Sequence, residues 1–265
     1  MDRHRLLGCA GFALAMTLCP HAQGAECPRQ DALGTSRILA VDAAATPRAG
    51  AKALQLGDRE VVLTFDDGPS RPTDGKILAG LAEQCVRATF FLIGKRASEH
   101  AELVRQIAAA GHSIGHHTWS HQNLKVMKPE EAVDEIDKGI AAVETALNGV
   151  STTIPSTPFF RFPGFLTNRQ TLDELEKRRI VVFDADIIAD DWIAMTQEAQ
   201  LKLLTDRLKA AGKGIILLHD TEAQTAAMLA DFLRYLRDNR YRVVHVVPGV
   251  AATAAANGRQ DGKRE

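Results

Sequence analysis

The sequence lacks several features that would assign a chain to a protein class at once. It has no excess of one charge, since 32 Lys and Arg balance 33 Asp and Glu, and it has no local run of basic residues. Nucleic-acid-binding proteins usually carry a basic surface, and this sequence gives no indication of one. Of its four cysteines, neither Cys27 nor Cys85 has a second Cys or a His close by, which argues against a zinc site of the cysteine type. After the first residues, no apolar run is long enough for stable membrane insertion.

The first 25 residues have the pattern of a secretory signal peptide. A short basic start is followed by an apolar run from Leu6 to Cys19 and by the small-x-small signal Ala22-Gln23-Gly24. The pattern predicts a secreted or periplasmic protein. Cleavage would leave Cys27 and Cys85, and an oxidising compartment favours one disulfide between them, with two unpaired thiols as the alternative.

The sequence after the signal peptide predicts one α/β domain. Residues 26–59 are expected to form an arm packed on the domain, residues 60–248 the domain itself, and residues 249–265 a disordered tail. Apolar strand-like runs alternate with amphipathic helical patterns, and the pattern from Pro129 to Leu147 is the clearest helix. Strands are predicted at 61–63, 88–93, 112–115, 159–162, 180–184, 214–219 and 242–247. Helices are predicted at 74–84, 98–110, 129–147, 171–177, 197–211 and 226–238. Seven strands with helices between them predict a parallel β/α barrel or a doubly wound sheet.

The segment Thr64-Phe65-Asp66-Asp67-Gly68-Pro69-Ser70 ends the first of these strands abruptly. Gly68 and Pro69 favour a fixed turn, so the two carboxylates are held in place. Like charges this close are costly unless a cation or donor compensates, which indicates a metal on one carboxylate and general-base work for the other. The alternative is a strand-ending turn whose Asp side chains cap the next helix.

Further polar residues follow the carboxyl ends of the other predicted strands, the edge at which α/β barrels build their active sites. Arg161, Asp190 with Asp191, and His219 each end or follow a strand. His117 and His121 have the i, i+4 spacing that lets two imidazoles meet one cation. His116 is an alternative ligand, and a pair of surface or capping histidines would have the same pattern.

Five ordered motifs resemble those of the polysaccharide deacetylases, the NodB-homology group of carbohydrate esterase family 4. They are Thr64-Phe65-Asp66-Asp67-Gly68-Pro69, His117-Thr118-Trp119-Ser120-His121, Arg161-Phe162-Pro163, Asp191-Trp192 and Leu218-His219. The resemblance extends over residues 60–247. It implies a distorted, TIM-like (β/α) barrel of about seven parallel strands. It also implies a divalent metal, usually Zn²⁺ with Co²⁺ or Ni²⁺ as alternatives, and hydrolysis of N-acetyl groups on glycans.

The resemblance also implies a role for each matched residue. Asp67, His117 and His121 would be the metal ligands, and Asp66 the general base oriented by Arg161. His219 would be the general acid with Asp191 as its partner, although Asp190 could take that place. Pro163 and Gly164 would lie at the substrate, with a backbone N–H near Gly164 stabilising the oxyanion, and Trp192 and Leu218 would line the acetyl pocket. The chain departs from the family in two respects. Gly164 and then Phe165 follow Pro163 where an aromatic residue usually comes first, and His116 precedes the first metal histidine where the family often has Asn.

These residues predict a secreted glycan N-deacetylase that acts as a monomer on a polymer or oligomer containing N-acetylglucosamine. An O-acetyl esterase on an acetylated polysaccharide is the alternative within the hydrolases, and a catalytically silent glycan-binding protein is the alternative outside them. Aromatic residues make up only 5% of the chain, so no long sugar-stacking groove is expected. The sequence does not distinguish peptidoglycan, chitin-like oligomers, xylan and exopolysaccharide as substrates.

Overall fold

The structure is a computed structural model that describes residues 31–249. The predicted signal peptide, Cys27 and the predicted tail from residue 250 lie outside the described residues. Cys85 is disulfide-bonded, but its predicted partner Cys27 is among the residues that are not described. Within residues 31–249, no helix has the length and apolar character needed to cross a membrane.

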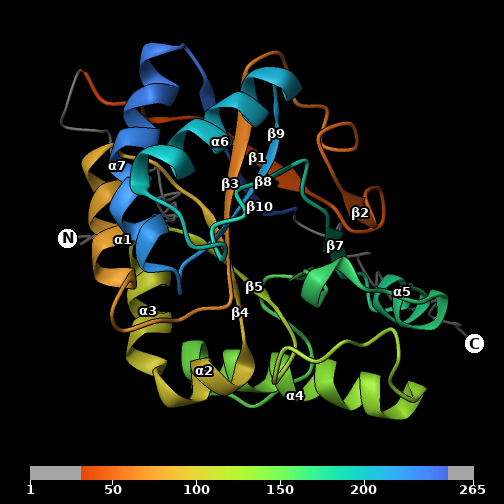
Figure 1. Ribbon diagram of the computed structural model, residues 1–265. Helices are drawn as coiled ribbons and strands as arrows, with labels where there is room; N and C mark the ends of the chain where they lie inside the picture. Colours follow the sequence, from red (N-terminus) through yellow and green to blue (C-terminus); the bar gives the residue numbers. More distant parts are fainter. Residues whose placement is uncertain (1–30, 250–265) are drawn as a thin grey trace, which may run out of the picture.

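The described strands form one sheet in which every pairing is parallel. Its main path runs β1 (Thr35–Val41), β10 (Arg242–Pro248), β3 (Glu60–Asp66), β4 (Thr89–Leu92), β5 (Ser113–His116), β6 (Phe159–Phe160), β7 (Val181–Phe183) and β2 (Arg48–Ala49). Strand β9 (Gly214–His219) pairs with β3 and with β8 (Ile187–Ile188). All seven predicted strands are present, and the predicted parallel α/β fold is confirmed as a distorted barrel whose strand order does not close within residues 31–249 (Figure 1).

Strand β3 is the centre of this sheet. Strand β9 pairs with it from Val61 to Asp66, while β10 and β4 share its other edge, at its start and its end respectively. Because side chains alternate along a strand, Val61, Leu63 and Phe65 pack in the core that β3 shares with the helices. Val62 packs in a second core inside the barrel. The same alternation places Thr64 and Asp66 on the inner side.

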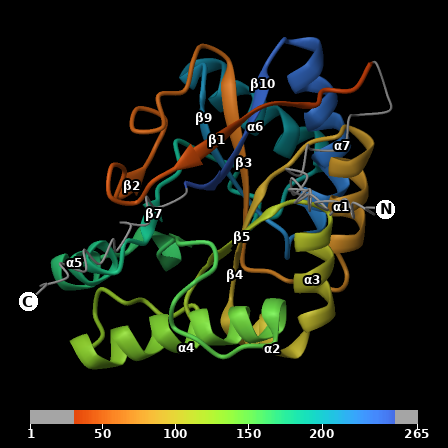
Figure 2. The ribbon, with the colours of Figure 1, turned by 180° about the vertical axis from the view of Figure 1, so that it is seen from behind.

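The helices are α1 (Asp74–Glu83), α2 (Gly94–Glu99), α3 (Ala101–Ala109), α4 (Pro129–Asn148), α5 (Arg169–Lys177), α6 (Gln197–Ala211) and α7 (Ala223–Asp238). Helices α1, α3 and α7 stack along one flank of the sheet, and α2 and α4 lie together below β4 and β5 (Figures 1 and 2). The predicted helix over 98–110 is instead two helices, because the backbone leaves the helical conformation at His100. Helix α4 agrees with its prediction: Pro129 occupies its first turn, and Gly149 ends it with a φ of 73°.

Three strands were not predicted. Strand β1 pairs along its length with β10, and β2 pairs with β7, so the described part of the segment before residue 60 contributes two strands to the sheet. Strand β8 is only two residues long and extends the sheet beyond β9. Its pairing with β9 brings the chain just before Asp190 and Asp191 to the same edge as His219.

Candidate metal and catalytic site

The parallel register aligns the predicted site residues at one edge of the sheet. Asp66 at the end of β3 is level with His219 at the end of β9, and His116 at the end of β5 is level with Leu92 and Phe160. The loops that follow these strands therefore start side by side. This is the carboxyl edge where the sequence predicted a site.

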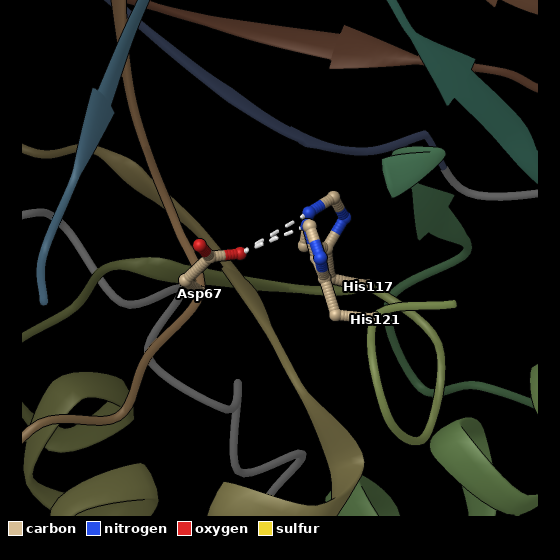
Figure 3. A group of neighbouring side chains, drawn as sticks. All are labelled: Asp67, His117 and His121. Carbon is tan, nitrogen blue, oxygen red and sulfur yellow. Dashed lines mark ion pairs between the residues drawn. The ribbon is translucent and has the colours of Figure 1, made fainter. Parts of the chain in front are cut away.

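Asp67, His117 and His121 converge at this edge. Asp67 Oδ1 lies 3.4 Å from His117 Nε2 and 3.4 Å from His121 Nε2, and the two imidazole rings lie 4.9 Å apart. Figure 3 shows both rings turned towards the carboxylate. His116, the alternative ligand, is absent from this group of candidate ligands. It is buried, and its Nε2 lies 3.8 Å from Glu144 on α4.

The protonation states of the three residues suit metal ligation. Burial alone would raise the pKa of Asp67, but His117 and His121 lower it to about 2, so the carboxylate is ionised. Burial lowers the pKa of His121, which favours the neutral imidazole. Nδ1 of His117 lies 2.7 Å from the carbonyl oxygen of Arg161, which can only accept a hydrogen bond. Nδ1 of His117 therefore carries a proton, and Nε2 is the ring nitrogen that faces Asp67.

The distances also fit a divalent ion. Asp67 Oδ1 is buried and has no hydrogen-bond partner within the described chain, although two imidazoles face it. Ligand atoms at about 2.1 Å from a tetrahedral Zn²⁺ are about 3.4 Å apart, which is the spacing between Asp67 Oδ1 and each histidine nitrogen. Three ligands would leave a coordination position open, as in catalytic rather than structural zinc sites.

Asp66 is held by a fully buried arginine. Arg161 donates hydrogen bonds to Asp66 Oδ1 at 2.7 Å and to Thr64 Oγ1 at 2.8 Å. It also donates to the carbonyl oxygen of Asp184 and lies 4.4 Å above the ring of Phe91. The other carboxylate oxygen of Asp66 is 3.8 Å from His117 Nε2. Arg161 thus fixes Asp66 from one side and leaves its second oxygen beside the candidate metal site.

His219 is paired with Asp191. Its Nδ1 lies 2.7 Å from Asp191 Oδ1, and its backbone N–H donates to Oδ2 at 2.6 Å. Burial opposes a charge on His219, but the hydrogen bond to Asp191 and the charges of Asp191, Asp66 and Asp67 raise its pKa to about 9. Asp190 instead forms an ion pair with Arg207 at 2.6 Å. The structure therefore brings Asp191, and not Asp190, to His219.

The four predicted substrate-binding residues have different surroundings. Trp192 is 53% exposed, and its ring meets that of His219 edge to face at 5.3 Å. Pro163 and Gly164 lie in a short 3-10 turn, where Gly164 has a φ of 56°. Leu218 was predicted to line the acetyl pocket, but it is fully buried in the core that faces the helices. Successive side chains of β9 point to opposite sides, so Leu218 faces away from the side of His219. Leu217 is on the same side of β9 as His219.

Several residues that support the site were missed by the sequence prediction. Thr225 at the start of α7 donates to Asp191 Oδ2 at 2.5 Å, and Gln224 donates to the carbonyl oxygens of Asp191 and Ile193. Thr64 links Arg161 to β9 by donating to the carbonyl oxygen of Ile216 at 2.7 Å. Only Thr64 had a signal in the sequence, since it lies two residues before Asp66 and so on the same side of the strand.

The fold and the site define a class of protein, an α/β domain with a candidate metal site at the carboxyl ends of its strands. The chain belongs to the polysaccharide deacetylase family, whose model matches residues 53–182. That range contains Asp66, Asp67, His117, His121 and Arg161. Asp191 and His219 lie beyond it.

Named relatives are similar over most of the described chain. A peptidoglycan-N-acetylglucosamine deacetylase of Bacillus cereus is 32% identical over 189 residues, which cover 68% of this chain and 66% of that protein. A peptidoglycan-N-acetylmuramic acid deacetylase of Bacillus subtilis is 29% identical over 188 residues, covering 70% of this chain and 38% of that protein. The chain therefore spans well under half of the Bacillus subtilis relative and about two thirds of the Bacillus cereus relative.

A solved structure has the same fold. A peptidoglycan deacetylase of Bdellovibrio bacteriovorus superimposes with a TM-score of 0.75 at 30% sequence identity. The superposition covers 89% of this chain and 65% of that one.

Proposed function

We propose that the protein is a secreted or periplasmic, metal-dependent hydrolase that removes N-acetyl groups from a glycan containing N-acetylglucosamine. The observation that carries the proposal is the gathering of three kinds of group at one edge of the sheet. They are a three-residue candidate metal site, Asp66 as a carboxylate held by Arg161, and His219, whose raised pKa keeps it protonated at neutral pH. The relatives, which are named peptidoglycan deacetylases, support the substrate class, and the predicted signal peptide supports the location.

Asp67, His117 and His121 would hold the ion. A bound divalent cation supplies an acidified water molecule and polarises a carbonyl oxygen. Asp66 is placed to accept the proton of the attacking water, because one carboxylate oxygen is engaged by Arg161 and the other faces the site. The guanidinium of Arg161 keeps this carboxylate from rotating.

His219 would complete the reaction. As the C–N bond of the acetamide breaks, the amine nitrogen needs a proton, because an amine is too poor a leaving group to depart as an anion. With Nδ1 bound to Asp191, His219 presents Nε2 as the donor. The products are acetate and the free amino sugar.

Two further groups would bind the acetyl part of the substrate. The N–H of Gly164 makes no hydrogen bond within the described chain, whereas the next N–H, that of Phe165, donates to Phe162. We assign the Gly164 N–H to the negative charge that develops on the carbonyl oxygen when water attacks the carbonyl carbon. Trp192, beside His219, and Leu217, on the same side of β9, would border the acetyl methyl.

The test is acetate release by the mature chain from N-acetylglucosamine oligomers, peptidoglycan and acetylated xylan. The protein is stripped with a chelator and then given Zn²⁺. Asp66→Asn is expected to lower the metal-dependent rate by about 100-fold or more, the usual worth of a general base. Asp190→Asn is the matched control, since this carboxylate pairs with Arg207 away from His219.

The same assay separates the alternatives. Acetate release that needs both the metal and Asp66 supports the hydrolase. Metal binding without acetate release from any member of the panel contradicts the proposal and favours the catalytically silent protein. An O-acetyl esterase has a better leaving group, so His219→Ala would spare part of its rate, whereas amide hydrolysis is expected to be abolished.

A further inference from the structure

The loop that carries the two histidines has an unusual backbone. Thr118 and His121 both have left-handed backbones, with φ values of 65° and 60°. Residues other than glycine rarely adopt this conformation, and they do so where surrounding structure determines it. The conformation of residues 117–121 therefore depends on contacts from outside the loop.

Helices α2 and α4 provide these contacts. The N–H groups of Gly94 and Lys95, at the start of α2, donate to the carbonyl oxygens of Thr118 and Trp119 at 2.9 Å each. From the other side, the Trp119 N–H donates to the carbonyl oxygen of Glu135 on α4 at 3.0 Å. The loop is thus bonded through its backbone to two helices.

One side chain of α4 binds the loop immediately before His121. Glu135 accepts two hydrogen bonds from Ser120, from its N–H at 3.0 Å to Oε2 and from its Oγ at 2.9 Å to Oε1. Both carboxylate oxygens are used on a single residue 15 positions away in sequence. Charge-assisted hydrogen bonds of this kind are among the stronger ones in proteins.

His121 needs this support more than His117 does. His117 is buried, and its Nδ1 is fixed by the carbonyl oxygen of Arg161. The His121 side chain is 42% exposed, and its backbone is held by the hydrogen bond from its N–H to Thr118 Oγ1. Its ring position is therefore set by the backbone of the loop.

We infer that Glu135 is a positioning residue for the metal site. By holding Ser120 it fixes His121 Nε2 at 3.4 Å from Asp67 Oδ1, and it acts through Ser120 without touching ion or substrate. The inference rests on the proposed metal-dependent function. It adds that zinc affinity depends on a carboxylate of α4 outside every motif of the family.

The experiment measures the zinc affinity of the full mature chain by competition with a chromophoric chelator. Glu135→Ala is expected to weaken zinc binding by about 10- to 100-fold, the usual effect of removing a residue that supports a metal ligand. Glu135→Gln retains one acceptor oxygen and should recover part of the affinity. Glu131→Ala, on the same helix in an exposed pair with Lys128, is the matched control and should bind zinc like the wild type.

A second comparison separates positioning from general damage to the fold. In a His121→Ala background, Glu135→Ala should cause little further loss of zinc affinity, because its effect passes through His121. An equal loss with and without His121 would overturn the inference, as would an unchanged affinity of Glu135→Ala. If Glu135→Ala does not fold, Ser120→Ala, which removes only the Oγ bond, gives the same comparison.

Failure of the proposed function would look different. A wild-type chain that binds no zinc overturns both proposals. A wild-type chain that binds zinc and releases acetate, with affinity unchanged in Glu135→Ala, overturns only the role of Glu135.

Discussion

At the scale of single residues, neighbouring charged groups in the site have different partners. Asp66 and Asp67 are adjacent in sequence but meet different partners, since Arg161 binds the first and the two histidines face the second. The sequence predicted these residue types and their common edge. It left open whether Asp190 or Asp191 pairs with His219, and whether His116 or His117 is the metal ligand. Adjacent residues of the same type look alike in a sequence, and only the backbone conformation shows which side each one faces. Arg207 and Glu144, which lie beside Asp190 and His116, come from helices α6 and α4.

The pair of His219 and Asp191 predicts a pH dependence. In the metal-free protein, an NMR titration of the His219 ring should give a pKa of about 9. Because the acid must be protonated, activity should fall at alkaline pH, and in the metal-loaded enzyme this limit should lie below the metal-free pKa, since a cation at Asp67 opposes the charge of His219. Asp191→Asn removes the negative charge and should move the His219 titration, and the alkaline limit of activity, to lower pH.

Asp190→Asn is the control for that titration and should leave it in place. If wild-type His219 titrates near the ordinary histidine pKa, the hydrogen bond to Asp191 does not raise its pKa as described.

At the scale of elements, the strength of the sequence pattern mattered more than the length, since the seven-residue β1 was missed while the two-residue β6 lies within a predicted strand. The strongly periodic α4 was predicted to within one residue of its end. Strands β2 and β8 have two residues each, too few for any alternation to be visible. The break at His100 was also missed, because residues on both sides of it favour helix. Leu218 was placed on the wrong side of a correctly predicted strand, since a motif carries no information about which side of a strand each residue occupies.

Helix α4 approaches the histidine loop closely enough that a single methyl group should matter. A Cβ added at Gly139 would lie 2.4 Å from the backbone carbon of Thr118, which cannot move without moving the loop. Gly139→Ala should therefore lower the free energy of unfolding by about 1–3 kcal/mol, the usual cost of overpacking. Urea unfolding measures this change.

Gly80→Ala in α1 provides the matched comparison. Its added Cβ would meet nothing closer than Leu229 at 3.7 Å. This variant should gain up to about 1 kcal/mol from the better helix propensity of alanine. Equal effects of the two substitutions would show that the contact between α4 and the loop is looser than described.

At the scale of the whole molecule, three buried histidines lie outside the proposed reaction. Burial lowers the pKa of His112 to about 3 and those of His116 and His245 to about 4. The folded protein keeps these rings neutral, while the unfolded chain takes up protons below its ordinary histidine pKa. Stability from these groups is therefore lost as the pH falls from about 6.5 through 4 to 3. Asp74 and Asp220, whose pKa values are raised by burial, act in the opposite direction.

The contribution of one histidine can be isolated by substitution. His245→Gln keeps a donor for Ser113, whose Oγ lies 3.0 Å from His245 Nε2. Between pH 7.5 and 5, this variant should lose roughly 2 kcal/mol less stability than the wild type, since it has no buried imidazole to protonate on unfolding. Urea unfolding of the metal-free proteins at both pH values measures the difference. Equal losses would contradict a neutral, buried His245.

The pairing of β3 with β9 has a consequence for the order in which the chain becomes competent. The Thr64–Ile216 hydrogen bond joins residues 152 positions apart, so β3 gains this neighbour only after most of the chain has been synthesised. Before that moment the growing polypeptide already contains the proposed base Asp66 and all three candidate ligands, but it has neither the proposed acid His219 nor a partner strand for one edge of β3. A chain interrupted in that interval has the candidate metal ligands without the proposed acid, so the proposed hydrolysis requires the last third of the polypeptide.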